Sequence, residues 1–207
     1  MSFIRDIREL CVNPDEFYRT RGDDPSLRKP VLIVFGVALL NIFSSVLLIS
    51  HVRVEGQSLA NTFLAVSGIF GSIFGVVGIF ILWLLFTAVF YALSIAFDGS
   101  GTFRQLFRFV GWGYFPAGFS AIASLVLTWY AIQSVPAGLE LQAFIQEYQS
   151  HPALEIASIV GVVILAWQAL IWVFAVHHAR NITLREAGLV VAIPTAANIA
   201  WNAFQLL

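Results

Sequence analysis

The stretch GQSLANTFLAVSGIFGSIFGVVGIFILWLLFTAVFYALSIAF, residues 56–97, decides the fold of this chain because it contains no charged residue. An apolar run of about 20 residues is enough to cross the ~30 Å hydrocarbon core of a bilayer. As a single helix rising 1.5 Å per residue, this stretch would extend for about 63 Å. We therefore expect it to break or to lie flat near its glycines, and we assign residues 72–97 as a membrane span.

The composition of the whole chain also indicates an integral membrane protein. Hydrophobic residues make up 59% of the 207 residues and charged residues 11%, whereas soluble domains carry about 25% charge. The net charge of -1 offers no cation surplus, so we exclude a nucleic-acid partner. The single cysteine, Cys11, excludes an intramolecular disulfide and a cysteine-rich metal site. Residues 5–29 are rich in charge, so we expect no cleavable leader.

Four further apolar runs are long enough to form spans, which makes five in all. The predicted spans are residues 31–50, 72–97, 111–135, 156–176 and 187–207. The predicted class is all-α: a polytopic five-helix transmembrane bundle with short amphipathic interfacial helices. Residues 1–30 would form a cytoplasmic amphipathic N-terminal segment, and residues 31–207 the transmembrane domain.

The Lys and Arg residues orient this bundle, because cytoplasmic loops carry an excess of them. With five spans, ten of the eleven Lys and Arg fall on one side and only Arg53 falls on the other. A hairpin within residues 56–97 would make six spans and would move four arginines outside: Arg104, Arg108, Arg180 and Arg185. We therefore predict a multi-pass protein of the cell membrane with a cytoplasmic N-terminus and an extracytoplasmic C-terminus. Residues 58–71 would be an external segment, either interfacial or re-entrant.

Local patterns predict short helices outside the spans. Apolar residues from Phe3 to Cys11 recur at helical spacing, which is typical of an amphipathic helix on lipid headgroups. Asn13 and Pro14 suit the N-cap and the first position of a second helix. The loop after the third span, residues 136–151, is predicted to form a short external helix.

The stretch FDGSGTFRQLFRFVGWGYFP, residues 97–116, is predicted to be a cytoplasmic turn followed by an interfacial helix. Thr102 and Gln105 have the spacing of a capping box. In the helix that follows, Phe103 and Phe107 would enter the acyl chains, and Arg104 and Arg108, which are four residues apart, would lie at phosphate depth. Anionic lipid would add about 1 kcal/mol per arginine, so these four residues are our candidate surface for lipid or for a protein partner.

Neutral polar residues within the spans are the candidate interior site. They are Asn41, Gln168, Asn198 and Asn202. Hydrogen bonds between helices would explain them, and a polar crevice or transport pathway would use the same residues. The predicted spans have no charge at mid-depth, which argues against ion-coupled transport. Pro116 and Pro194 are expected to kink the third and fifth spans.

No catalytic, cofactor or metal site is expected. His177 and His178 are adjacent and would point about 100° apart on a helix, while His51 and His151 lie on the opposite side of the predicted bundle. Gly71 and Gly75, flanked by Gly68 and Gly78, match a small-xxx-small pattern. That pattern leaves open close packing within the chain and pairing of two copies.

Several motifs together resemble the Yip family of Ypt/Rab-interacting membrane proteins, in particular its prokaryotic branch. They are NPDEFY and DDPSLRKPVLIV before the first span, and a hairpin and motif formed by Asp98, Gly99, Gly101, Gly113, Tyr114 and Pro116. The resemblance implies a five-helix membrane domain without an established catalytic centre. Eukaryotic relatives are associated with small GTPases, vesicle traffic and membrane shaping. Their long N-terminal region is reduced here to residues 1–30.

Two functions follow from these features. The first is a non-catalytic membrane scaffold or interaction protein with a basic cytoplasmic face that binds lipid or a partner. The alternative is a small transporter or permease with a pathway past Asn41, Gln168 and Asn198.

Overall fold

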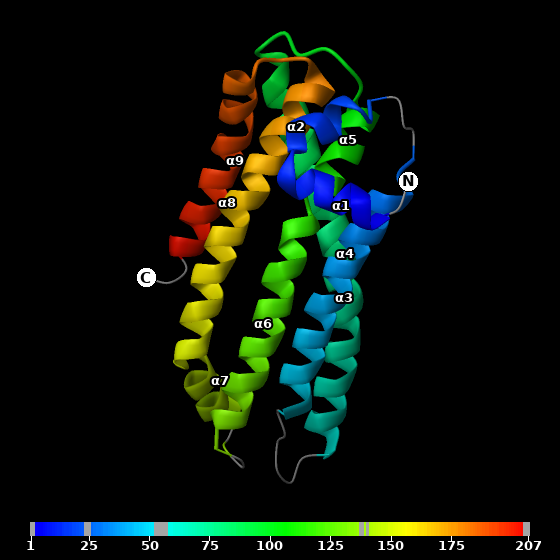
Figure 1. The fold of residues 1–207 in the computed structure, drawn as a ribbon. Helices are drawn as coiled ribbons and strands as arrows, with labels where there is room; N and C mark the ends of the chain where they lie inside the picture. Colours follow the sequence, from blue (N-terminus) through cyan, green and yellow to red (C-terminus); the bar gives the residue numbers. More distant parts are fainter. Residues whose placement is uncertain (1–2, 23–25, 52–57, 137–138, 140, 205–207) are drawn as a thin grey trace.

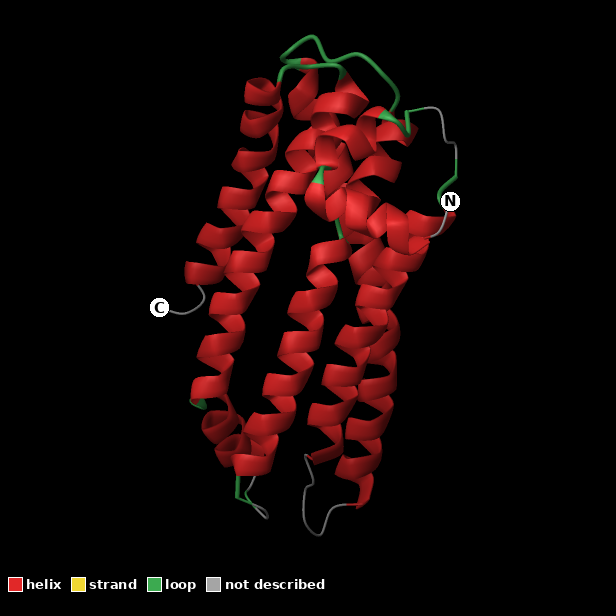
Figure 2. Ribbon diagram, in the orientation of Figure 1, coloured by secondary structure: helices red, strands yellow, loops and turns green. Residues whose placement is uncertain are grey.

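The chain is entirely helical in the part that the structure describes. A computed structural model describes residues 3–22, 26–51, 58–136, 139 and 141–204, and these residues form helices and loops without a strand (Figure 2). The predicted all-α class is therefore confirmed.

Long helices run alongside one another and give the molecule its elongated shape (Figure 1). They are α3 (Arg28–His51), α4 (Ser58–Ile95), α6 (Phe115–Ser134), α8 (Pro152–Arg180) and α9 (Leu184–Phe204). Helix α6 packs between α3 and α8, and α9 packs against α8. In Figure 1, α9 ends part-way along the bundle.

The predicted count of five spans is one more than the described part of the chain supports. Four segments are long and apolar enough to cross a membrane: Arg28–Ile49, Ile73–Ile95, Phe103–Ser134 and Pro152–Arg180. The fifth predicted span corresponds to α9, and the side chains of α9 from residue 201 onward lie outside the described part. Residues 205–207 of that prediction lie outside the described part.

The expected break in residues 56–97 is wrong for the described residues. Residues 58–95 form the single helix α4, and its segment Ile73–Ile95 is a candidate span. Each glycine in a helix costs about 1 kcal/mol relative to alanine, but an open backbone in lipid leaves polar groups unsatisfied at several kcal/mol each. An unbroken helix is therefore the better solution. A Cβ atom on Gly71, Gly75 or Gly78 would meet no described atom within 4 Å, so these glycines do not mark a close packing seam.

Short helices lie at the two ends of the bundle. Helices α1 (Phe3–Val12), α2 (Pro14–Arg19) and α5 (Phe103–Trp112) lie at the upper end of Figure 1. We call them the cap, together with the adjoining residues 83–95 of α4, 171–180 of α8 and 184–191 of α9. Helix α7 (Leu141–Gln149) lies at the opposite end, as the prediction for residues 136–151 required. Its Tyr148 hydroxyl is 3.2 Å from the Thr128 hydroxyl of α6.

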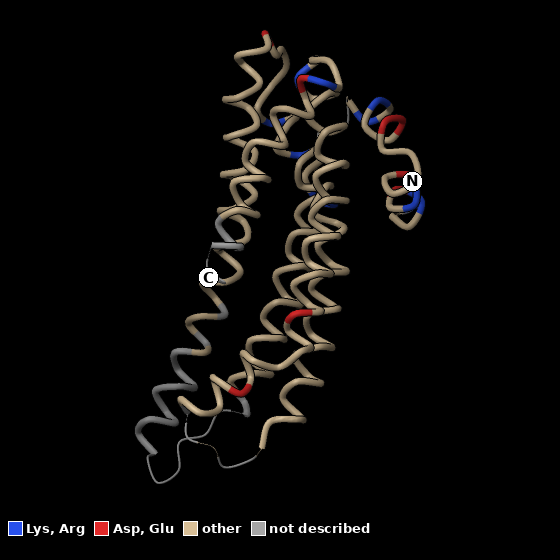
Figure 3. Tube along the Cα trace, turned by 90° about the vertical axis from the view of Figure 1, so that its left-hand side faces the viewer, with Lys and Arg blue, Asp and Glu red and all other residues tan. Residues whose placement is uncertain are grey.

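Positively charged side chains gather at one end of the bundle, as the count of Lys and Arg predicted. Ten of the eleven Lys and Arg are described, and all lie at the cap end (Figure 3). The eleventh, Arg53, lies outside the described residues. Arg104 and His177, from distant parts of the sequence, consequently lie at the same end.

The predicted helix starts are present in atomic detail. The Asn13 side chain accepts a hydrogen bond from the Glu16 amide at 3.3 Å, and the Thr102 hydroxyl accepts from the Gln105 amide at 3.2 Å. At the start of α9, Glu186 and Thr183 bond to one another's backbone amides at 2.8 and 3.3 Å. These reciprocal bonds form a capping box.

The prolines behave differently from one another. Pro194 lies inside α9, as predicted. Pro116 lies in the first turn of α6, where a proline leaves no hydrogen bond unmade, so the expected kink within the third span is wrong. The backbone instead turns at Gly113 and Tyr114, which separates α5 from α6.

Candidate functional site

Helix α5 is buried in the cap by aromatic side chains that bind its C-terminal carbonyl groups. The indole N–H of Trp83 donates to Phe107 O at 2.8 Å, and that of Trp172 donates to Val110 O at 3.0 Å. The Tyr18 hydroxyl donates to Phe109 O at 3.1 Å. Val110 O is among the last four carbonyls of α5, which lack partners further along the helix, and the three side-chain bonds together hold α5 in one position.

Glycines let these tryptophans approach α5 closely. A Cβ atom on Gly111 would lie 2.4 Å from Trp83, and one on Gly113 would lie 2.3 Å from Trp172. Gly101 has a φ of +97°, and its Cβ would lie 2.3 Å from Ala179 O. Any other residue would have to displace these atoms. The family-like motif is therefore a packing motif in this structure, with the Tyr114 ring edge-on to Trp172.

Arg180, at the end of α8, clamps the turn between α4 and α5. Its guanidinium donates to Ser94 Oγ at 2.8 Å and to the carbonyls of Gly99 and Gly101. It also lies over the Tyr91 ring, 4.1 Å from the centroid. Only 2% of Arg180 is exposed. Sequence reasoning used this arginine only for orientation and missed its structural role.

The predicted arginine pair does not lie on one surface. Arg104 is exposed, but Arg108 is 6% exposed and its guanidinium donates to the carbonyls of Arg21 and Gly22 at 2.8 and 2.9 Å. The reason is that α2 covers α5, so the arginine face of α5 turns partly inward. The phenylalanines also pack on α4, because Phe107 stacks on Trp83 with centroids 3.9 Å apart and Phe103 lies edge-on to Tyr91.

An ion-pair network holds α1 against the rest of the cap. The buried carboxylate of Asp6 accepts from Arg21 at 2.6 Å and from Lys29, and Arg21 also donates to Glu9 at 2.9 Å. Burial raises the pKa of the Asp6 carboxyl, but the bonds and charges of Lys29 and Arg21 outweigh burial and hold that pKa below its ordinary value. Asp6 thus lies on the buried face of α1, together with Leu10.

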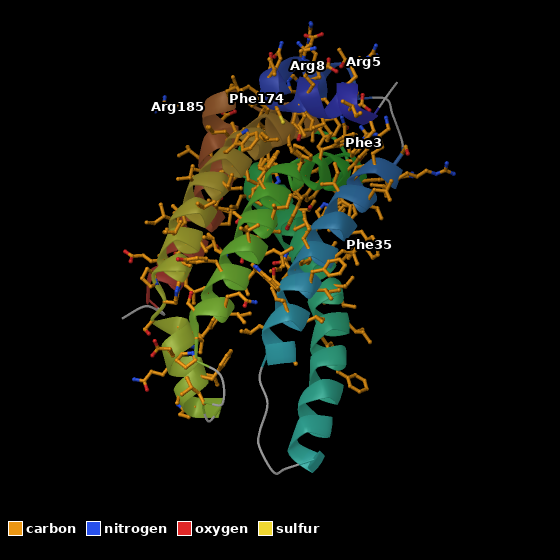
Figure 4. All side chains as sticks on the ribbon, turned by 60° about the horizontal axis from the view of Figure 1, so that its bottom comes forward. Phe3, Arg5, Arg8, Phe35, Phe174 and Arg185 are labelled. Atoms are coloured by element: carbon orange, nitrogen blue, oxygen red, sulfur yellow. The ribbon has the colours of Figure 1, made fainter. Side chains whose placement is uncertain are left out.

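The outer face of α1 combines cations with exposed apolar side chains. Arg5 and Arg8 project from the cap (Figure 4), and Ile4 and Val12 are 79% and 77% exposed. Arg5 and Arg8 also line a hollow of about 450 Å³ between α1 and α2. The phenyl ring of Phe3 instead packs against Trp112, with centroids 6.3 Å apart. This outer face of α1 can contact an anionic, partly apolar surface.

A second candidate site lies in the middle of the bundle, among the predicted interior polar residues. A cavity of about 520 Å³ is lined by side chains of α3, α6, α8 and α9. Its polar members are Asn41, Ser120, Ser124, Ser158 and Gln168. Asn41 and Ser158 are exposed at its mouth, whereas Gln168 is 5% exposed.

The interior polar residues differ in their hydrogen bonds. Asn41 Nδ2 donates to Val37 O at 2.8 Å, within its own helix. Gln168 forms no hydrogen bond with the described residues, so its amide faces the cavity. Asn198 lies on α9 near Ile199, which lines the same cavity. The side chain of Asn202 lies outside the described part.

Histidines and an aspartate meet at the cap, where the sequence predicted no metal site. His178 Nε2 lies 2.7 Å from Asp15 Oδ1, and the rings of His177 and His178 have centroids 4.6 Å apart. Helix α2 brings Asp15 beside the two histidines, and the local sequence around His177 and His178 gives no sign of this contact.

These features define a multi-pass helical membrane protein with four candidate spans in its described residues. The Yip1 domain model matches residues 8–203, so the chain belongs to the Yip1 domain family, as the motifs had indicated. An uncharacterized protein of Methanocaldococcus jannaschii is 25% identical over 128 residues, which cover 61% of this chain and 91% of that protein. This archaeal relative agrees with a prokaryotic branch. No solved structure matches the chain.

Proposed function

We propose that this protein is a non-catalytic membrane scaffold whose cap binds anionic lipid headgroups at the cytoplasmic face of the cell membrane. The cation excess at the cap end supports a cytoplasmic N-terminus. The C-terminus would then lie toward the extracytoplasmic side. A protein partner would use the same surface.

The observation that carries the proposal is the outer face of α1. Arg5 and Arg8 are exposed beside Ile4 and Val12, while the opposite face of the helix is fixed by Asp6 and Leu10. A basic amphipathic face of this kind inserts apolar side chains between headgroups and attracts anionic lipid. Exposed positive charge at the same end of the molecule also comes from Arg185 (Figure 4) and from Arg104 on α5.

Native mass spectrometry of the detergent-solubilised protein tests this function. Titration with phosphatidylglycerol should give more bound lipid than titration with phosphatidylcholine. At about 1 kcal/mol per arginine, replacing Arg5 and Arg8 by Glu should weaken phosphatidylglycerol binding by about 30-fold. The Arg5→Lys and Arg8→Lys double variant is the matched control and should keep the preference. Equal binding of both lipids by the unmodified protein would refute the lipid-binding role.

A second function, a small transporter or permease, is favoured by the cavity at mid-depth. Gln168 faces the cavity without a partner among the described residues, and binding sites in transporters lie near the bilayer midplane. The described cavity lining is uncharged, so a neutral polar solute is the substrate class that it suits.

Stopped-flow light scattering of proteoliposomes tests the transport function. Glycerol should enter vesicles that contain the protein faster than empty vesicles, and the Gln168→Leu variant should lose the difference. A Leu170→Ala variant, changed at a 63% exposed position of the same helix, is the control and should transport normally. Equal glycerol entry with and without the unmodified protein excludes this solute and counts against the function.

A further inference from the structure

The cluster of Asp15, His177 and His178 has the chemistry of a metal site. Each residue offers one ligand atom, and these atoms lie within 4.8 Å of one another. Two imidazole nitrogens and a carboxylate oxygen suit Zn²⁺, which is bound by such ligands at about 2.0–2.2 Å. Asp15 belongs to the short α2, whereas both histidines belong to the last turn of α8.

The hydrogen bond of His177 occupies Nδ1 and leaves Nε2 as the ring nitrogen that can coordinate a metal. Its Nδ1 lies within bonding distance of Ile182 O. A carbonyl oxygen only accepts, so Nδ1 carries the proton and donates it, and Nε2 keeps its lone pair. Histidines that bind metals commonly donate their other ring N–H to a backbone carbonyl in this way, which fixes the tautomer and the ring orientation.

A hydrogen bond joins His178 and Asp15 at the place where a metal ion could join them. His178 Nε2 now donates to Asp15 Oδ1 over 2.7 Å. A metal ion would take the place of the proton between Nε2 and Oδ1. A neutral His178 would then carry that proton on Nδ1, so metal binding would release no proton. Asp15 is 53% exposed and His178 17% exposed along their side chains, which gives an ion access from solvent.

We propose that Asp15, His177 and His178 bind Zn²⁺ or a divalent transition metal of similar ligand preference, with water completing the coordination. Ligands at about 2.0–2.2 Å from a tetrahedral ion lie about 3.4 Å apart. Asp15 and His178 would therefore separate slightly from 2.7 Å, while ligand atoms as far apart as 4.8 Å would move closer. Asp15 can make this movement because it is exposed on a short helix. The bound ion would fasten α2 to α8, and with it the N-terminal part of the cap. This inference is independent of lipid binding and of transport.

Isothermal titration of the solubilised full-length protein with ZnCl₂ tests the site. Binding of one Zn²⁺ per chain is expected, and the His178→Ala and His177→Ala variants should each weaken it at least tenfold. Asp15→Asn should weaken binding in the same direction. The His51→Ala variant, at the far end of α3, is the matched control and should bind Zn²⁺ unchanged.

X-ray absorption of the zinc-loaded protein identifies the ligands directly. Two imidazoles and oxygen ligands around the ion are expected, and the His177→Ala, His178→Ala double variant should lose both imidazoles. Far-UV circular dichroism checks that each variant is folded. Absence of saturable Zn²⁺ binding overturns the proposal, as does unchanged binding in a folded double variant.

Discussion

The cap and the distal part of the bundle, residues 40–51, 58–82, 120–136 and 141–165, are built on different principles. In the cap, side chains far apart in the sequence interlock, as Trp172 on α8 and Tyr18 on α2 do when they bind carbonyls of α5. In the distal part, large apolar side chains such as Phe74 and Val163 are 71% and 63% exposed to the surroundings. A lipid solvent can solvate those side chains, whereas polar backbone groups in the cap need protein partners.

This difference shows where the sequence is constrained. The cap depends on residues that fit only one arrangement: glycines under tryptophans and an arginine that binds carbonyls. The distal part needs mainly length and hydrophobicity, and its residues Asn41, Ser120 and Ser124 line part of the mid-depth cavity. Substitutions should therefore act very differently in the two regions.

Matched tryptophan substitutions give the sharpest contrast. Trp172 is 1% exposed in the cap and Trp129 is 52% exposed in the distal part. Trp172→Ala should lower the free energy of unfolding by about 3–5 kcal/mol, as is typical of a buried Trp, whereas Trp129→Ala should have a much smaller effect. Far-UV circular dichroism during SDS titration measures both. Similar losses of unfolding free energy in the two variants would contradict the proposed difference between the cap and the distal part.

Arginine substitutions test the clamp on the turn between α4 and α5. Arg180→Ala removes the guanidinium that donates to Ser94, Gly99 and Gly101. It should lower the free energy of unfolding by about 1.5–3 kcal/mol, the range for hydrogen bonds to charged groups. Hydrogen exchange of residues 98–101 should accelerate. The exposed Arg185 is the matched control, and Arg185→Ala should leave exchange of this turn unchanged. Unchanged hydrogen exchange in Arg180→Ala would mean that residues 98–101 keep their conformation without Arg180.

The effect of replacing a polar residue of the bundle by an apolar one should depend on whether that residue has a hydrogen-bond partner. Gln168 has no hydrogen bond to the described residues, so Gln168→Leu should stabilise the protein by about 1 kcal/mol. The Thr128 hydroxyl is 3.2 Å from that of Tyr148. Thr128→Val should therefore lower the free energy of unfolding by about 0.6 kcal/mol. SDS titration measures both the expected gain and the expected loss of stability. A destabilised Gln168→Leu variant would show that this amide stabilises the fold.

Acidification should release α1 from the cap without unfolding the bundle. The pKa of Asp6 lies below its ordinary 3.8 in the folded protein, so its contribution is full above about pH 3.8 and is lost as the pH falls through the folded value. A dye on a Val12→Cys, Cys11→Ser variant should show lower anisotropy in that range. Asp6→Asn should show the lower value already at neutral pH. A pH-independent anisotropy in the variant with Asp6 would contradict the role of the network.

Much of the fold could be predicted because its causes are local. The long uncharged runs give the candidate spans, and short patterns such as Thr102 with Gln105 give the helix starts. The orientation of charge also followed from counting Lys and Arg. The continuity of α4 was missed because glycines were taken as breaks, although lipid penalises an open backbone more than a glycine penalises a helix.

The candidate sites were predicted less well because they depend on contacts between distant segments. Arg108 was expected at phosphate depth, but the chain after α2 supplies carbonyls that draw it inward. Nothing in the local pattern around His178 indicates that Asp15 lies beside it. Two signals were available: glycines within an amphipathic helix, which indicate close approach, and an arginine at a helix end without an acidic neighbour.

The central claim is that the cap and α7 lie on opposite sides of a bilayer, and single-cysteine labelling tests it most directly. Val12→Cys and Ser134→Cys, each combined with Cys11→Ser, place exposed thiols at the two ends of the molecule. A membrane-impermeant maleimide should label the Val12→Cys variant in inverted vesicles and the Ser134→Cys variant in intact cells. Labelling of both variants from the same side would contradict the account.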